Sequence, residues 1–166
     1  MSILIIPESV FHTVTSWAES CYPREGCGLI FGDFTGEGDK RSSRFVPLRN
    51  ILTQSDEKRT SPVWEAATAS LGARVSNQGR TEFVMDPEEV DRVSLAAQQE
   101  GLDLVGIVHT HPDHPAEPSA TDRAQPMLAV WSNVIVQVVQ GKYVELRSWT
   151  RPDDKVPFHE ETIRIA

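Results

Sequence analysis

Two histidines, His109 and His111, stand at the end of a short apolar run with one residue between them. The run, residues 105–108, is rich in β-branched side chains and predicts a buried strand. Because residues i and i+2 of a strand point to the same face, both imidazoles leave this strand together and can bind one cation. Pro112 cannot donate to a strand ladder, so we expect the strand to end there.

A second polar pair, Ser119 and Asp122, follows a turn-rich loop over residues 113–118. Ser119 can cap a short helix, and this fold-back can return the carboxylate of Asp122 to the two histidines. Two neutral imidazoles, one carboxylate and room for water form the donor set of a catalytic zinc site with one open position. We therefore predict that His109, His111 and Asp122 bind Zn²⁺.

Each of these residues also has a simpler interpretation. A His-x-His pair on a strand is often only a surface or packing feature, so the prediction of a metal depends on the proline, serine and aspartate that follow. Ser119 can be a helix cap and nothing more. His114, in the loop between the ligands, is an alternative third imidazole, although Asp122 already completes a three-ligand site with an open position.

An acidic residue, Glu25, precedes a second apolar run over residues 27–31, in which glycines indicate close approach of another backbone. From composition alone, Glu25 is a solvated carboxylate at the entrance of a strand. The surrounding sequence makes Glu25 a candidate functional residue, because residues 25–28 read Glu-Gly-Cys-Gly.

The two motifs together resemble the signature of the JAMM (MPN+) metalloproteases, which combine His-x-His-Pro, six further residues and Ser-x-x-Asp with an upstream glutamate in a Glu-x-Cys-Gly-type segment. Here the first motif runs from His109 to Asp122, and the glutamate is Glu25. Residues 111–122, together with the later Glu-Leu-Arg-Ser-Trp at 145–149, are most similar to the small bacterial Mec-like branch. The resemblance covers most of the chain.

This resemblance implies a zinc metallopeptidase, either a peptidase or an isopeptidase. It implies that His109, His111 and Asp122 hold Zn²⁺, that Glu25 is the general base and that Ser119 donates to the oxyanion. The implied substrate is the C-terminal tail, commonly ending in Gly-Gly, of a small ubiquitin-fold or sulfur-carrier protein, with release of cysteine or a short adduct. Two alternatives stay open: a catalytically silent MPN scaffold that binds such tails, and a broader deubiquitinase-like enzyme.

The bulk properties are those of an ordinary globular protein of 166 residues, 39% hydrophobic and 24% charged. The formal net charge of −8 disfavours nucleic acid and anionic membranes as partners, because both reward basic surfaces. No run approaches the ~20 apolar residues that span a bilayer, and we expect a cytoplasmic protein.

The two cysteines, Cys21 and Cys27, are too few for a disulfide scaffold, so we expect reduced, partly buried thiols. The oligomeric state is not predicted.

We expect one domain, residues 1–166, with an α/β or α+β sandwich in which a mixed, largely antiparallel sheet is flanked by helices. The family resemblance implies a JAMM/MPN core of the cytidine-deaminase-like type. Strands are expected at residues 3–6, 27–31, 44–48, 81–85, 102–108, 134–139, 143–149 and 162–165, the last at an edge of the sheet. Helices are expected to begin at Pro7 and at Asp86, with shorter helices at 64–75 and 123–130 and a glycine-rich turn at 33–39.

Residues 51–80 form the least regular part of the chain, with few apolar anchors. A connection of this length inside a compact domain is usually functional or disordered. We expect a flap beside the active site that touches the partner protein, and the alternative is a mobile surface insertion. Asn50, which ends the strand before this segment, is expected to cap a turn, and the alternative is a structural role near the site.

Overall fold

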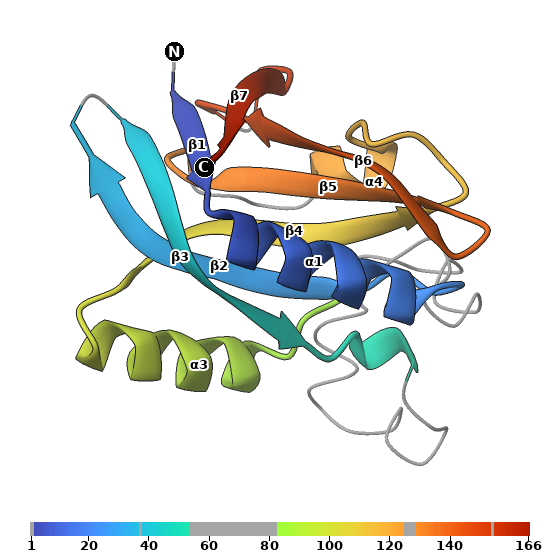
Figure 1. Ribbon diagram of the computed structural model, residues 1–166, viewed down its shortest axis with the longest axis horizontal. Coiled ribbons are helices and arrows are strands. Elements are labelled where there is room, and N and C mark those ends of the chain that lie inside the picture. The colour runs from blue at the N-terminus through green and yellow to red at the C-terminus, as the bar shows by residue number, and fades with distance from the viewer. Residues whose placement is uncertain (1, 37, 54–82, 125–128, 154) are drawn as a thin grey trace.

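The computed structural model describes residues 2–36, 38–53, 83–124, 129–153 and 155–166 (Figure 1). The predicted helix at 64–75 and most of the expected flap at 51–80 therefore lie outside the described residues. The described start of that segment is a 3-10 helix, Ile51–Thr53, in which Ile51 and Leu52 are buried. These two residues belong to the body of the fold and not to a surface insertion.

Seven strands of the described chain form one closed sheet in the order β1-β3-β2-β4-β5-β6-β7. Their bounds are Ile3–Ile6 (β1), Cys27–Thr35 (β2), Asp39–Leu48 (β3), Asp103–Pro112 (β4), Ser132–Val139 (β5), Lys142–Thr150 (β6) and His159–Ile165 (β7). Strand β1 is parallel to β3 and β7, and β4 is parallel to β5, whereas the other neighbours are antiparallel. The expectation of a mixed sheet is confirmed, and four of the seven pairings among the described strands are antiparallel. The prediction of an edge strand near the C-terminus is wrong, because β7 pairs with both β6 and β1 and closes the sheet.

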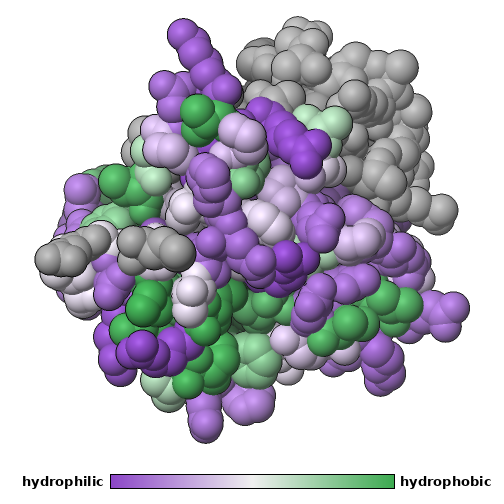
Figure 2. Space-filling model, turned by 90° about the horizontal axis from the view of Figure 1, so that it is seen from above, coloured by the Kyte–Doolittle hydropathy of each residue, from purple (hydrophilic) through white to green (hydrophobic). Residues whose placement is uncertain are grey.

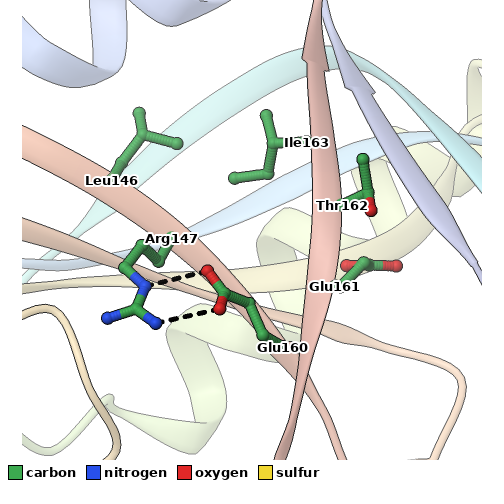
Figure 3. A pocket seen from close by; sticks show the side chains of 6 residues that line it. All are labelled: Leu146, Arg147, Glu160, Glu161, Thr162 and Ile163. Carbon is green, nitrogen blue, oxygen red and sulfur yellow. Dashed lines mark hydrogen bonds and ion pairs between the residues drawn. The ribbon is translucent and has the colours of Figure 1, made fainter.

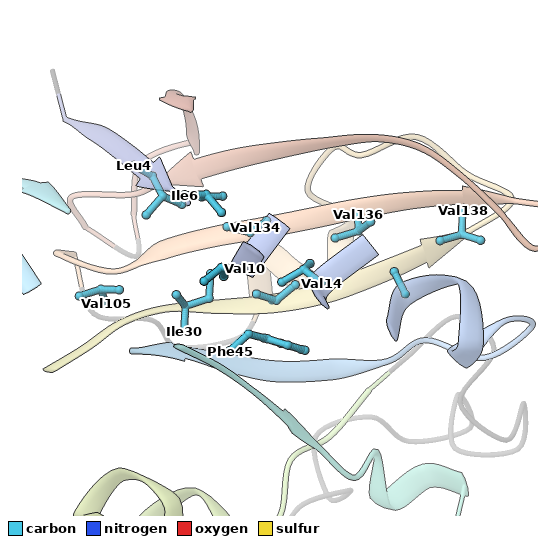
Figure 4. Packing of buried hydrophobic residues seen from close by; sticks show 12 residues of the cluster. Leu4, Ile6, Val10, Val14, Ile30, Phe45, Val105, Val134, Val136 and Val138 are labelled. Atoms are coloured by element: carbon cyan, nitrogen blue, oxygen red, sulfur yellow. The ribbon is translucent and has the colours of Figure 1, made fainter. Parts of the chain in front are cut away.

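Two helices cover opposite faces of β2. Helix α1, Glu8–Cys21, buries an apolar stripe at helical spacing that packs against Ile30 of β2 (Figure 4). Helix α3, Pro87–Gln99, lies over the other face, where Leu29 and Phe31 belong to a second cluster. Strand β2 is therefore buried on both sides, which explains why its sequence is an uninterrupted apolar and glycine run.

Several predicted boundaries change in the structure. The expected turn at 33–39 is shorter, because β2 continues to Thr35 and β3 begins at Asp39. The expected strand at 81–85 is wrong where it is described, since Met85 forms only an isolated bridge with Asn50. The expected helix at 123–130 is instead a five-residue helix α4, Ala120–Ala124, and residues 125–128 lie outside the described part.

Other expectations hold. Strand β4 ends at Pro112, and α3 begins after Asp86, whose side chain accepts a hydrogen bond from the backbone N–H of Glu88. Cys21 and Cys27 are free thiols. Burial raises the pKa of Cys21 to about 11 and raises the pKa of Cys27 as well, so both stay protonated at neutral pH. None of the described helices is long and apolar enough to cross a bilayer.

A buried carboxylate joins several strands of the closed sheet. Glu161 of β7 forms an ion pair of 2.8 Å with Lys40 of β3, and both side chains are almost fully buried. The hydroxyl groups of Ser132 in β5 and Ser148 in β6 donate to the same carboxylate, at 2.6 and 2.7 Å. The hydroxyl of Ser2 donates to it at 2.6 Å. Burial raises the pKa of Glu161, but these partners outweigh that effect and leave the pKa below its usual value.

We expect Glu161→Gln to lower the free energy of unfolding by about 3–5 kcal/mol, because the charge of Lys40 would stay buried without its carboxylate. Urea denaturation at neutral pH measures the loss. Glu145→Gln, at an exposed position of β6, is the matched control and should unfold like the wild type. Equal midpoints for Glu161→Gln and the wild type would contradict this role.

The stabilisation by Glu161 should also depend on pH. Because its pKa is lowered in the folded protein, its contribution is complete above the unfolded pKa of about 4.3 and is lost as the pH falls through the folded value. The difference in stability between the wild type and Glu161→Gln should therefore shrink as the pH is lowered below about 4.3. Denaturation curves of both proteins at successive acid pH values measure the trend, and a constant difference would refute it.

Candidate metal centre

The antiparallel pairing of β2 with β4 brings the Glu25 segment beside the two histidines. Cys27, the first residue of β2, lies opposite His109. One step further, the backbone N–H of Thr110 donates to the carbonyl of Gly26 at 3.0 Å, and the Thr110 hydroxyl accepts from the N–H of Gly26 at 2.8 Å. These bonds place Glu25 just before β2, next to the histidine end of β4.

His109 and His111 lie on β4 with their imidazoles side by side. Both side chains are almost completely buried, and their Nε2 atoms are 3.1 Å apart. The ring of His109 also stacks on Phe83, with ring centroids 4.7 Å apart and an angle of 27° between the planes. Among the described residues, Nδ1 of His109 has no hydrogen-bond partner, so the stacking on Phe83 is the contact given for the face of this ring.

Asp122 reaches the same point from α4. Its Oδ1 lies 3.1 Å from Nε2 of His109, and its Oδ2 lies 3.2 Å from Nε2 of His111. Ser119 sets this position, because its hydroxyl accepts from the N–H of Asp122 at 3.1 Å and its own N–H donates to Oδ2 at 2.8 Å. Burial raises the pKa of Asp122, but the neighbouring His109 and the other hydrogen bonds outweigh it, and the pKa lies far below its usual range.

The three donors fit a zinc ion. Zinc–ligand bonds of about 2.0–2.1 Å in a tetrahedron separate neighbouring donor atoms by ~3.3 Å, close to the 3.1–3.2 Å found here. Nδ1 of His111 lies 2.6 Å from the carbonyl oxygen of Pro115 and donates to it. That bond leaves the lone pair of the neutral ring on Nε2, which faces the other donors. The predicted ligands therefore converge as a metal site requires.

Glu25 is buried beside this set of donors. Its Oε1 lies 3.8 Å from Nε2 of His111, beyond hydrogen-bond distance. The side-chain amide of Asn50 donates to the backbone carbonyl of Glu25 at 3.0 Å, and its Oδ1 accepts from the N–H groups of Leu52 and Val84. Asn50 thus caps a turn, as predicted. It also holds the backbone of Glu25, a role near the site that the sequence analysis did not prefer.

His114 forms a second group with Glu25 and His111. One ligand atom from each of the three lies within 4.8 Å of the others, and the rings of His114 and His111 stack at 4.1 Å. Burial lowers the pKa of His114, and its Nδ1 lies 2.7 Å from the carbonyl of Pro112. This group is more exposed than the set formed with Asp122, so we favour the predicted ligands and keep His114 as the alternative.

Three contacts at the site were missed at the sequence level. Phe83 and Thr110 hold His109 and the Glu25 segment, but an isolated aromatic residue and a lone threonine carry no local pattern. Asp113, although exposed, accepts from the hydroxyl of Tyr22 at 2.6 Å and from the N–H of Gln140 at 2.8 Å. Its φ of 59° lies in the left-handed region, which aspartate tolerates better than most residues.

The closed sheet, the two covering helices and the convergent His-His-Asp donors define a protein of the JAMM/MPN type. Residues 7–152 match the family model described as prokaryotic homologs of the JAB domain, and the chain belongs to that family.

Known relatives agree with this assignment. A desampylase of Haloferax volcanii is 31% identical over 101 residues, which cover 59% of this chain and 63% of the relative. A desampylase of Pyrococcus furiosus is 31% identical over 121 residues, covering 73% of this chain and 64% of the relative. The chain thus spans somewhat less than two thirds of the length of these relatives. The solution structure of a Desulfitobacterium hafniense protein has the same fold, with a TM-score of 0.70, 24% identity and coverage of 98% of this chain and 92% of that one.

We expect His111→Ala and Asp122→Ala to lose bound zinc, because each removes one of three buried donors. His114→Ala should keep about one equivalent of zinc, which separates the two candidate groups. Metal analysis after dialysis against buffered zinc measures this, with His159→Ala, at an exposed position, as the control. Loss of zinc from His114→Ala together with retention in Asp122→Ala would overturn the predicted ligand set.

Proposed function

We propose that this protein is a zinc-dependent peptidase or isopeptidase that hydrolyses an amide bond at the C-terminal tail of a small ubiquitin-fold protein. The observation that carries the proposal is the buried carboxylate of Glu25, which lies 3.8 Å from His111 and beside the three convergent donors. A purely structural metal site has no use for a second buried acid at this distance. Amide hydrolysis does, because a nucleophile must lose a proton and the leaving nitrogen must gain one.

His109, His111 and Asp122 would hold the zinc ion, which when bound supplies a Lewis acid and lowers the pKa of water at its open position. Glu25 takes the proton of the attacking water and passes it to the leaving nitrogen. Asn50 fixes the backbone at Glu25, which keeps this carboxylate at the edge of the donor set.

Ser119 has two compatible roles. Its hydroxyl oxygen accepts from the backbone of Asp122, which makes it a cap of α4. Among the bonds of the described residues, none uses the hydroxyl proton of Ser119, which can donate to the oxyanion that develops on the substrate carbonyl. One such donor contributes on the order of 3 kcal/mol to transition-state stabilisation.

The substrate class is supported by the relatives. Two of them are named desampylases, enzymes that remove ubiquitin-like SAMP proteins from their conjugates. The resemblance to the Mec-like branch narrows the proposal to a sulfur carrier with a Gly-Gly tail, from which the enzyme releases cysteine or a short adduct.

We expect Glu25→Ala to keep its zinc but to lose at least ~100-fold in turnover, since it removes the base and leaves all three metal donors in place. The substrates are a carrier–cysteine fusion and a ubiquitin conjugate, each with and without a chelator. Glu88→Ala, at an exposed position in the first turn of α3, is the matched control and should retain activity.

The outcomes separate the alternatives. Full activity of Glu25→Ala would end the proposed mechanism. Zinc binding without cleavage of either substrate by the wild type would favour the silent scaffold. Cleavage of the ubiquitin conjugate but not of the carrier fusion would favour the broader deubiquitinase-like enzyme.

A further inference from the structure

The loop between β4 and Ser119, residues 113–118, orients one of the metal donors, and we call it the metal loop. Nδ1 of His111 donates to the Pro115 carbonyl in this loop at 2.6 Å. The direction of the His111 lone pair therefore depends on where the loop holds that carbonyl. Partners of this kind tune metal affinity nearly as strongly as the ligands themselves.

The residue after Pro115 is anchored by a tryptophan from another part of the sheet. The indole Nε1–H of Trp149, in β6, donates to the carbonyl of Ala116 at 3.0 Å. Ala116 is completely buried, so this part of the metal loop lies inside the protein. The ring of Pro115 locks its φ angle, so fixing the carbonyl of the next residue, Ala116, restricts how the Pro115 carbonyl can turn.

Trp149 is itself held by an ion-pair network. Arg147 lies with its guanidinium 4.7 Å from the centroid of the Trp149 ring and donates two parallel bonds to Glu160 of β7, at 2.8 and 2.9 Å. Figure 3 shows this pair along one side of a pocket between β6 and β7. A third bond, from Nη1 of Arg147 to Glu117 at 3.2 Å, returns to the metal loop. The loop is thus joined to β6 at two successive residues.

In Figure 2, hydrophilic side chains cover most of the face of the molecule seen from above, with hydrophobic ones gathered over part of it. Exposed ion pairs usually contribute little to the stability of a protein. The bidentate geometry of Arg147 and Glu160, and the aromatic ring beneath the guanidinium, distinguish this pair from isolated surface contacts.

We propose that Trp149 is a positioning residue that sets the orientation of His111 through the metal loop, with Arg147 and Glu160 holding its ring in place. The proposal rests on the metal site of the proposed function. It goes beyond that function by assigning a role to residues of β6 and β7 that contact neither the donors nor Glu25. Trp149 acts through Ala116 and Pro115, and it does not touch the reacting atoms.

Trp149→Phe tests this, because it keeps an aromatic ring under Arg147 and removes the Nε1–H donor together with one ring of the indole. We expect its dissociation constant for Zn²⁺ to rise about 10-fold, measured by competition with a chromophoric chelator. The absorption spectrum of the Co²⁺-substituted protein should change as well, since a turned imidazole alters the ligand field. The midpoint of urea denaturation of the metal-free protein should change little, because a single hydrogen bond makes a small net contribution to stability.

Trp131→Phe is the matched control, since this half-buried tryptophan precedes β5 and makes no described contact with the metal loop. It should keep wild-type zinc affinity and the wild-type cobalt spectrum. Wild-type values for both in Trp149→Phe would overturn the proposal, as would an equal loss of affinity in Trp131→Phe. If Trp149→Phe does not fold, Arg147→Lys is used as the test variant. Weaker zinc binding by Arg147→Lys supports the positioning role of Trp149, and unchanged zinc binding overturns that role.

The metal readouts keep this test separate from the proposed function. If the wild type cleaves neither the carrier fusion nor the ubiquitin conjugate but Trp149→Phe binds zinc more weakly than Trp131→Phe, the hydrolase assignment fails and the positioning role stands. If the wild type cleaves its substrate and Trp149→Phe is unchanged in zinc affinity and cobalt spectrum, the positioning role fails alone.

Discussion

The register of β2 against β4 is the constraint on which the site depends. Gly26 and Thr110 exchange hydrogen bonds although 84 residues separate them, and this contact aligns Glu25 with the histidines. A slip of one residue would turn every side chain of a strand to the opposite face, so His109 and His111 would leave the site together. Gly26 also has to be glycine, because a Cβ there would lie 2.5 Å from Sγ of Cys21 in α1.

The parallel pairing of β4 with β5 explains how the third donor arrives. Parallel neighbours need a long crossover connection, whereas antiparallel neighbours can be joined by a tight turn. In this chain the crossover leaves β4 at Pro112 and carries the metal loop and α4 before it returns to β5. Asp122 lies on that return path and folds back over the end of β4. The crossover that the parallel pairing requires thus brings Asp122, the donor that β4 does not carry, to the two histidines.

The rest of the fold holds these two pairings rigid. Helices α1 and α3 bury both faces of β2, so the strand that carries the Glu25 segment has little freedom to move. The carboxylate of Glu161 joins β7 to β3, β5 and β6 inside the closed sheet. A buried charge of this kind is costly unless it is fully hydrogen-bonded, and here each oxygen has two partners. This rigid scaffold can hold the side chains of His109, His111 and Asp122 close together.

Much of the site could be predicted from the sequence, because its rules are local. The i, i+2 spacing of His109 and His111 on a strand, the stop at Pro112 and the serine cap before Asp122 all follow from short-range backbone geometry. The mixed sheet and the first helix could be read from apolar periodicity for the same reason. These features depend only on residues that are close together in the chain, so they can be predicted from the sequence.

Only the tertiary structure decided which distant residues meet. Asn50 and Phe83 reach the site from either side of a long segment, and Trp149 reaches the metal loop from β6, without any periodic signal. The expected edge strand failed for the same reason, since its parallel partner β1 lies at the other end of the chain. Pairing between remote strands depends on the packing of the whole chain, whereas the spacing of ligands along one strand depends only on the backbone that joins them.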